Sequence, residues 1–352
     1  MVKCAECKSS KTIKKGSRNG KNRYFCKKCG VWFWIDHRRK DQALWISHVD
    51  GAPFRKLGDQ QELSGKQVFK KVVAEINALP WNWQLTKLLC NMLLFCGILV
   101  IDGKYIAVKG FEAKIPFIWG IDYLTHDIPH GDLFTVEDEA AFSQFFGKLK
   151  DLGYQPRIVI ADDRQGLKQA LNKVFPYAKL QLCHVHFVEN IRQLLNIRTD
   201  EKYHHFFNSL IAHVFKVKKE SKITKGLMHV FYKRTYGNRM LQNIVTGIKH
   251  RQTELFNYLQ IKNCPNNTNL IELYNSHLQA RLKSIKGFQS FDSANRWLNG
   301  YLIRRRTKPL TDCKTKFKKL NGFASLQFTI ADPKLWPTEI SGIKLPKQEP
   351  KR

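Results

Sequence analysis

Three acidic residues each interrupt an apolar or helical pattern at the end of a predicted element. Asp102 follows the apolar run 98–101, Asp162 follows the apolar run 158–161, and Glu272 begins a predicted helix. Two strand-end aspartates and a helix-borne glutamate that converge can hold two divalent ions. Because all the ligand atoms are oxygens, such a site selects magnesium or manganese. The ions would activate a water or a 3′-hydroxyl group for attack on a phosphodiester.

Each of these acids also fits a purely structural role. Asp102 with Gly103 is a favoured hairpin turn, Asp162 or Asp163 can cap the following helix, and Asn269-x-x-Glu272 matches a capping box. Taken singly, each structural role is the stronger interpretation. The hypothesis of a metal site therefore depends on the three acids together.

Four cysteines form two Cys-x-x-Cys pairs with the spacing of a tetrahedral zinc ribbon, Cys4 with Cys7 and Cys26 with Cys29. Residues 8–25, between the pairs, contain several lysines and arginines and no acidic residue. We therefore predict a structural Zn²⁺ in a small basic module that contacts a phosphate backbone. A metal-stapled fold whose partner is a protein is the alternative. The aromatic residues 32–34 are expected to cap the core of the ribbon.

The composition indicates a basic protein with a polyanionic partner. The 352 residues include 60 Lys and Arg against 29 Asp and Glu, a net charge of +31, and 43% are hydrophobic, enough for a sizeable core. No signal peptide precedes the first cysteine pair, and the other cysteines are scattered singly, so we expect a reducing compartment without disulfides. The apolar run 88–101 is too short to cross a membrane and is interpreted as a core helix that leads into a strand.

Residues 40–79 are predicted to form a helix-turn-helix. Apolar residues recur at helical spacing in two stripes, and Ser64 is a plausible N-cap for a last helix that carries Lys66, Gln67, Lys70 and Lys71. A small helical bundle without DNA contacts is the alternative. The neighbouring basic ribbon favours the DNA-reading interpretation.

The rest of the chain predicts a mixed α/β sheet that is interrupted by helices. Strand patterns come first and then alternate with helices up to Leu182. From residue 188 to residue 265 the pattern is helical throughout, which indicates an all-helical insertion. The proline-containing end is predicted to be an unpacked tail. The expected domains are a zinc ribbon (1–36), a helix-turn-helix (40–79), an α/β domain in two parts (95–187 and 266–325), the insertion (188–265) and a C-terminal tail (326–352).

The order of several short motifs resembles the Mutator superfamily of DDE transposases over about residues 98–310. These motifs are Asp102-Gly103, the run 159–162 with Gly166-Leu167, Cys183-x-x-His186 with Asn190, and the run 268–272 with Asn275 and Arg281. Asp102, Asp162 and Glu272 match the three acidic positions of the family, and Gly166 favours Asp162 over the neighbouring Asp163. Cys183 and His186 match a motif near the active site that is not a primary metal ligand.

The resemblance implies a ribonuclease H-like catalytic domain with a helical insertion before the glutamate, and magnesium- or manganese-dependent cleavage and strand transfer. The N-terminal ribbon and helix-turn-helix resemble the DNA-binding region of a bacterial insertion-sequence branch. The implied partners are terminal inverted repeats and target DNA, with a homodimer or larger assembly at synapsis, in a prokaryotic cytoplasm and without a membrane. His184 is an extra histidine, interpreted as a polar residue at a helix start.

We therefore expect a DDE transposase of an insertion sequence. Two alternatives stay open, namely a non-catalytic DNA-binding regulator in which the acids are structural, and a ribonuclease H-like nuclease that cuts without joining. The run Arg304–Arg306 is interpreted either as a phosphate-contacting helix end or as a solvated basic face. Asp122, another strand-end acid, is predicted to be a turn residue because Thr125 and His126 follow it.

Overall fold

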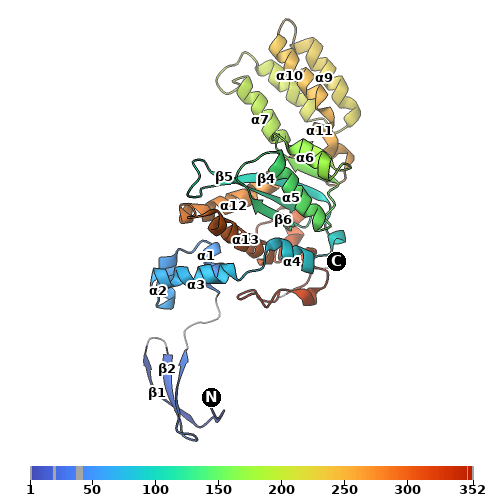
Figure 1. Ribbon diagram of the computed structural model, residues 1–352. Coiled ribbons are helices and arrows are strands. Elements are labelled where there is room, and N and C mark those ends of the chain that lie inside the picture. The colour runs from blue at the N-terminus through green and yellow to red at the C-terminus, as the bar shows by residue number, and fades with distance from the viewer. Residues whose placement is uncertain (1, 19–20, 37–42, 347, 351–352) are drawn as a thin grey trace. The chain divides into compact units, whose positions relative to one another are not determined.

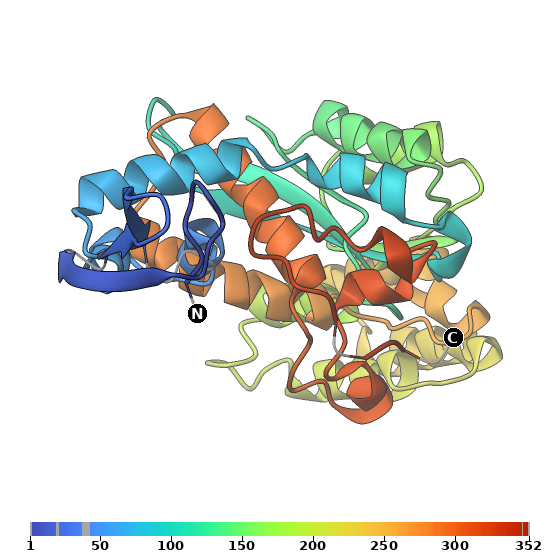
Figure 2. The ribbon, with the colours of Figure 1, turned by 90° about the horizontal axis from the view of Figure 1, so that it is seen from below.

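The computed structural model describes all residues except 1, 19–20, 37–42, 347 and 351–352. The chain divides into two compact units (Figures 1 and 2). The first comprises Met1–Leu79 with Pro337–Leu345, and the second comprises Pro80–Trp336 with Pro346–Arg352. Among the described residues, no helix is both long enough and apolar enough to span a bilayer.

The first unit begins with a three-stranded antiparallel sheet in the order β1 (Thr12–Arg18), β2 (Lys21–Cys26) and β3 (Trp32–Asp36). Its small core contains two of the paired cysteines together with Tyr24 and Phe33. Because successive residues of a strand face opposite sides, Trp32 and Trp34 are 47% and 50% exposed. The expectation that all three aromatic residues cap the core is therefore wrong for the two tryptophans. The Arg23 guanidinium lies 4.2 Å from the centroid of the Trp32 ring.

Three helices follow, α1 (Leu44–Val49), α2 (Phe54–Gln61) and α3 (Gly65–Asn77). Ser64 caps α3 as its sequence predicts, through a capping box with Gln67. The apolar stripe of α3 is buried, whereas Lys66, Phe69 and Lys70 are exposed. These helices thus bury one face and leave a basic face on α3 open to solvent.

The C-terminal segment is packed, so the prediction of an unpacked tail is wrong. In the first unit, the Trp45 indole N–H donates to the carbonyl oxygen of Ser341 at 2.9 Å, and Ile340 and Ile343 are buried. In the second unit, two short 3₁₀ helices, η5 (Ser325–Phe328) and η6 (Pro333–Leu335), precede the buried Trp336. The prolines shape this segment into turns, and its apolar residues supply core contacts that the composition alone does not indicate.

The second unit contains a five-stranded mixed sheet. Its strands are β4 (Ile98–Ile106), β5 (Ile115–Asp122), β6 (His130–Leu133), β7 (Ile158–Ala161) and β8 (Lys179–Leu182), in the order β6-β5-β4-β7-β8. The pairs β4–β5 and β5–β6 are antiparallel, and the pairs β4–β7 and β7–β8 are parallel. The mixed α/β architecture that the sequence predicts is therefore confirmed.

Helices cover both faces of this sheet (Figures 1 and 2). Leu99 and Ile101 of β4 share a core with α5 (Glu139–Asp151) and α6 (Leu167–Val174). On the opposite face, Trp119 of β5 contacts Tyr274 of α12 (Asn269–Ile285) and Tyr301 of α13 (Phe291–Thr307). Side chains at even positions of β4 therefore face α12.

The chain between β8 and α12 contains no strand. It forms α7 (His184–Leu194), α8 (His204–Leu210), the π-helix η2 (Ile211–Phe215), α9 (Glu220–Arg234), α10 (Arg239–His250), α11 (Gln252–Phe256) and the 3₁₀ helix η3 (Asn257–Gln260). Its apolar residues continue the core that α5 and α6 form with the sheet. Gln181 of β8 also hydrogen-bonds the carbonyl oxygen of Leu255, which ties the helices to the sheet edge.

The run 88–101 differs from its predicted form. The helix α4 (Asn82–Leu89) ends early, a 3₁₀ turn η1 (Met92–Leu94) follows, and β4 begins at Ile98. Leu88 and Leu93 are exposed, so this segment is not a core helix. A further 3₁₀ helix, η4 (Thr315–Leu320), lies near the end of the unit.

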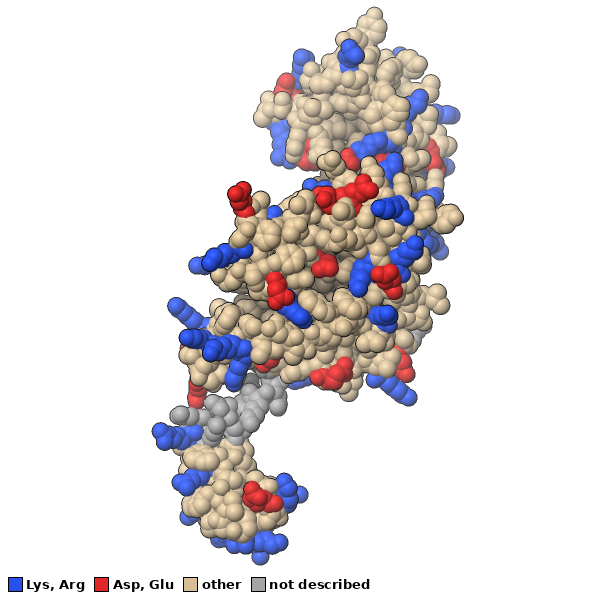
Figure 3. Space-filling view, viewed as in Figure 1, with Lys and Arg blue, Asp and Glu red and all other residues tan. Residues whose placement is uncertain are grey.

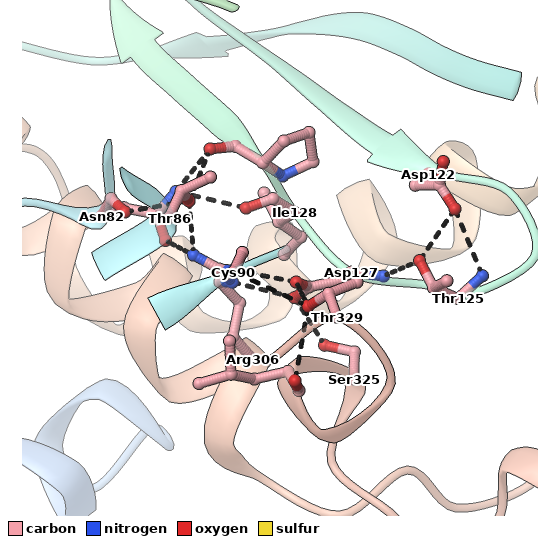
Figure 4. A network of polar contacts seen from close by, with 12 residues as sticks. Asn82, Thr86, Cys90, Asp122, Thr125, Asp127, Ile128, Arg306, Ser325 and Thr329 are labelled. Atoms are coloured by element: carbon pink, nitrogen blue, oxygen red, sulfur yellow. Dashed lines mark hydrogen bonds and ion pairs between the residues drawn. The ribbon is translucent and has the colours of Figure 1, made fainter. Parts of the chain in front are cut away.

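A buried ion pair joins distant segments of the second unit (Figure 4). Arg306 of α13 is 1% exposed, and its Nε and Nη2 each lie 2.8 Å from an oxygen of Asp127, in the loop after β5. The same guanidinium donates to Thr86 of α4 at 2.7 Å, and Asp127 accepts a hydrogen bond from Ser325. Burial alone raises the pKa of Asp127, but the charge of Arg306 holds it below its usual value. Arg306 is therefore neither a phosphate-contacting residue nor part of a solvated basic face, so both expectations for the run Arg304–Arg306 are wrong at this position.

We predict that Arg306→Ala lowers the free energy of unfolding by about 3–5 kcal/mol, because it leaves the Asp127 carboxylate buried without a counterion. Urea unfolding measures this change. The exposed Lys319→Ala is the control and should stay within about 0.5 kcal/mol of wild type. Equal effects of the two substitutions would contradict the structural role of the pair.

Candidate active site and metal centres

The first two predicted acids lie side by side on neighbouring parallel strands. Val100 of β4 pairs with Ile160 of β7. Because strand residues two apart share a face, this register puts Asp102 and Asp162 at the same level, toward α12. Asp102 lies in the middle of β4, which continues to Ile106. The hairpin-turn alternative for Asp102 is therefore wrong, since the turn lies at residues 107–114.

Asp102 is held by two hydrogen bonds. Its Oδ1 accepts from the Gly103 backbone N–H at 2.8 Å, and its Oδ2 accepts from Asn275 Nδ2 of α12 at 2.7 Å. Burial raises the pKa of Asp102 to about 6, and the nearby charge of Asp162 adds to this effect. Binding of a cation therefore has to displace a proton below about pH 6, and the divalent charge would favour the ionised form.

Asp162 lies directly after β7 and faces a histidine. Its Oδ1 is 2.7 Å from His186 Nδ1 of α7. This is a close contact and not a directed hydrogen bond, since Asp162 Oδ1 is buried without a hydrogen-bond donor. Burial raises the pKa of Asp162, and the charges of His186 and Arg164 oppose this effect.

Glu272 lies in the first turn of α12 and completes the group of acids. Its Oε1 accepts a hydrogen bond from Thr268 Oγ1 at 2.7 Å and lies 3.8 Å from His186 Nδ1. The charge of Glu272 also raises the pKa of Asp162. Thr268 is the N-cap of α12 and makes no side-chain cap, so the capping-box alternative for Asn269 and Glu272 is wrong.

Asp163 lines the same hollow as Asp162 but pairs with an arginine. Its carboxylate forms a two-pronged ion pair with Arg251, at the end of α10, with Nη2 2.7 Å from Oδ1. This pairing lowers the pKa of Asp163. The N-cap of α6 is Gly166, which adopts a positive φ of 78°, so neither Asp162 nor Asp163 caps that helix. The structure thus brings Asp162, and not Asp163, to Asp102 and Glu272.

Cys183 and His186 lie next to Asp162, in a solvent-accessible hollow that Phe187 and Asn190 also line. Cys183 Sγ is 3.3 Å from His186 Nδ1 and accepts a hydrogen bond from the Thr268 backbone N–H at 3.4 Å. His184 begins α7, as predicted. It is buried, and its Nε2 lies 2.5 Å from the carbonyl oxygen of Leu255.

Asp122 is a buried turn residue, as predicted. Its carboxylate accepts hydrogen bonds from Thr125 Oγ1 at 2.8 Å and from Tyr154 at 3.1 Å. It also accepts from the Gly97 backbone N–H at 3.1 Å, which fixes the entry to β4. These contacts use both of its carboxylate oxygens within the protein.

The four N-terminal cysteines form a second candidate metal centre. All four Sγ atoms lie within 4.8 Å of one another, with 3.6 Å between Cys4 and Cys29 and between Cys7 and Cys26. Tetrahedral zinc with bonds of about 2.3 Å requires sulfur atoms about 3.8 Å apart. Lys8 and Gly30 follow the two cysteine pairs, both with positive φ, and each backbone N–H donates to the first cysteine of its pair. These two equivalent turns bring the sulfur atoms to positions that could hold zinc.

Residues 126–306 match the family model described as Transposase, Mutator family. This chain belongs to the Mutator family of transposases. It is therefore a DNA transposase, as the sequence motifs predict. The matched segment contains Asp162, Cys183, His186 and Glu272, whereas Asp102 lies before it.

Similarity to curated transposases extends beyond this segment. The transposase is 27% identical over 296 residues to the transposases for insertion sequence element IS256 in transposon Tn4001 from Staphylococcus aureus and Enterococcus faecalis. These alignments cover 76% of this chain and 71% of each relative. It is also 24% identical over 165 residues to the transposase for insertion sequence element IS1201 of Lactobacillus helveticus, over 45% of this chain and 43% of that protein.

Two charged residues near Asp102 have no counterpart in the sequence-based prediction. Glu137 lies in the loop before α5, its side chain is 6% exposed, and it accepts a hydrogen bond from Tyr105. Arg164, two residues after Asp162, lies 3.9 Å from Glu137. Glu137 raises the pKa of Asp102, and Arg164 lowers it. No spacing or periodicity marks Glu137, because it reaches the site from an irregular loop.

We predict that the purified transposase carries about one tightly bound zinc per chain, held by four thiolates at about 2.3 Å. Metal analysis and X-ray absorption measure the content and the bond lengths. The double variant Cys4→Ser/Cys26→Ser should lose this zinc, because two ligands cannot hold a structural ion. The matched control Cys96→Ser/Cys313→Ser should keep it. Zinc content that is unchanged in the first variant would exclude the ribbon site.

Proposed function

We propose that Asp102, Asp162 and Glu272 are the catalytic acids of this transposase. The electrostatic coupling of Asp162 with both Asp102 and Glu272, on β4, at the end of β7 and on α12, carries this proposal. Two Mg²⁺ or Mn²⁺ ions at these oxygens would supply Lewis-acid activation of the attacking hydroxyl and stabilise the leaving oxygen. The reaction would be hydrolysis of a phosphodiester, followed by joining of the freed 3′-hydroxyl to target DNA.

Neighbouring side chains orient these acids. Asn275 and the Gly103 backbone N–H fix the Asp102 carboxylate, and Thr268 fixes Glu272. His186 places positive charge beside Asp162 whenever its imidazole is protonated. Such hydrogen bonds leave the acids less freedom to rotate, so a metal ion meets a nearly formed site.

The strand order supports a ribonuclease H-like catalytic domain. Its first three strands are antiparallel neighbours, and the next two are parallel additions on the other side of β4. In this proposal the catalytic domain comprises residues 95–187 and 266–325, and the helical insertion comprises residues 188–265. The helices tied to β8 between these two parts are consistent with this division.

DNA recognition belongs to the first unit in this proposal. A zinc-bound ribbon over residues 1–36 and a helix-turn-helix over residues 40–79 would bind the terminal inverted repeats, with α3 as the recognition helix. Its exposed Lys66 and Lys70 fit that role. Lysines and arginines also spread over the catalytic unit (Figure 3), which suits contacts with flanking and target DNA. Synapsis of two ends would require a dimer or a larger assembly.

Two alternative functions lead to different results in the same assays. A regulator would bind the repeats without cutting them, and a nuclease would cut without joining. The loss of every structural alternative for Asp102, Asp162 and Glu272 disfavours the regulator. A strand-transfer assay with a pre-cut end separates the transposase from the nuclease.

We predict that Asp102→Ala, Asp162→Ala and Glu272→Ala each abolish cleavage of a labelled terminal-repeat duplex in magnesium while DNA binding persists. Loss of one ligand misplaces both ions, so the three variants should be equally inactive. Asp163→Ala is the control, because its partner is Arg251, and it should retain measurable activity. Active Asp162→Ala with inactive Asp163→Ala would reverse the assignment. Tight repeat binding without any cleavage by wild type would favour the regulator.

We also predict that Lys66→Ala/Lys70→Ala weakens binding of the full chain to the repeat and reduces the salt dependence by a slope of up to about 2, one for each phosphate contact. Binding titrations at several salt concentrations measure both quantities. The matched control Lys150→Ala/Lys173→Ala removes the same charge from exposed positions of α5 and α6. Repeat preference should fall only in the first variant, and an equal loss in both would contradict recognition by α3.

A further inference from the structure

Three donor atoms of different chemical type meet beside the proposed magnesium site. Asp162 Oδ1, Cys183 Sγ and His186 Nδ1 all lie within 4.8 Å of one another. His186 Nδ1 is 2.7 Å from the aspartate oxygen and 3.3 Å from the sulfur. They come from the end of β7 and from the start of α7, which two neighbouring strands bring together.

This donor set selects a different ion from the three acids. Thiolate and imidazole ligands favour zinc, cobalt and similar ions, whereas magnesium prefers oxygen. A tetrahedral zinc ion with ligand distances of about 2.0–2.3 Å holds its donor atoms about 3.2–3.8 Å apart. Small side-chain movements would bring the three donors to these separations, and the hollow beside them gives access from solvent.

The surrounding contacts also suit a metal ion. Asp162 Oδ1 is buried and receives no directed hydrogen bond, so an electron pair is available there. Thr268 donates to Cys183 Sγ through its backbone N–H at 3.4 Å, and its hydroxyl oxygen, which donates to Glu272, lies 3.2 Å from the same sulfur. Donors of this kind stabilise a metal-bound thiolate and fix its direction.

We propose that Asp162, Cys183 and His186 form a second zinc-type metal site, and that its occupation inhibits the transposase by withdrawing Asp162 from magnesium. The metal-binding part of this proposal depends only on the three donor residues. The inhibitory part rests on the proposed catalytic role of Asp162. The two parts therefore require separate measurements.

Cobalt binding to the full chain tests the site itself. Co²⁺ is added to protein whose ribbon keeps its zinc, in a reductant that does not bind metals. We expect wild type to gain one equivalent of Co²⁺ with a near-ultraviolet thiolate-to-cobalt absorption band. Cys183→Ser should lose this band, and the matched control Cys313→Ser should keep it.

The comparison between variants also corrects for exchange at the ribbon, since cobalt that enters the ribbon gives the same signal in every variant. A band that requires Cys183 supports the site. Absence of the band in wild type, or equal bands in wild type and Cys183→Ser, overturns the proposal without any reference to catalysis.

Zinc titration of magnesium-dependent cleavage tests inhibition. Zinc should inhibit wild type and Cys313→Ser alike, and added magnesium should relieve the inhibition because both ions need Asp162. Cys183→Ser, measured against its own zinc-free rate, should require at least about tenfold more zinc. Equal inhibition of all three proteins overturns the inhibitory part. Failure of the catalytic proposal itself appears separately, as cleavage that persists in Asp162→Ala.

Discussion

The parallel pairing of β4 with β7 is the constraint on which the candidate active site depends. The register that pairs Val100 with Ile160 carries Asp102 and Asp162 to one face of the sheet. A slip of one residue would send one carboxylate into the apolar core under α5. The third acid arrives on α12, after the chain has passed through the helices 184–260 and returned. For the acids to meet, α12 must therefore pack against the same face of the sheet as Asp102 and Asp162.

Bringing the acids together has an electrostatic cost, which the surrounding side chains reduce. Burial and mutual repulsion raise the pKa values of Asp102 and Asp162. Asn275 donates a hydrogen bond to one of these acids, and the His186 imidazole lies beside the other. The Asn275 amide and the His186 imidazole thus lie beside the two acids before any metal binds. Asp163, one residue further along, differs from Asp162 because its carboxylate forms an ion pair with Arg251, between α10 and α11.

Several features followed from local sequence. The cysteine spacing, the Ser64 cap, the helical run and the strand-end acids all depend on residues close together in the chain, where spacing reports geometry directly. Other expectations failed where long-range contacts decide. The sequence predicts an exposed position for Arg306, whereas in the structure its side chain is buried in an ion pair with Asp127. The C-terminal segment is predicted to be an unpacked tail, whereas in the structure the Trp45 indole hydrogen-bonds its backbone.

The sequence by itself indicated the chemistry proposed for this transposase: four thiols that could bind zinc, three acids proposed to bind divalent cations and a basic surface suited to DNA. It could not distinguish Asp162 from Asp163, or a catalytic acid from a helix cap, because adjacent side chains differ only in the direction they point. Tertiary structure decided those directions through strand register and helix docking. It also brought Glu137 and Thr268 to the acids. The sequence did not indicate these two residues, because contacts between residues far apart in the chain leave no local spacing to detect.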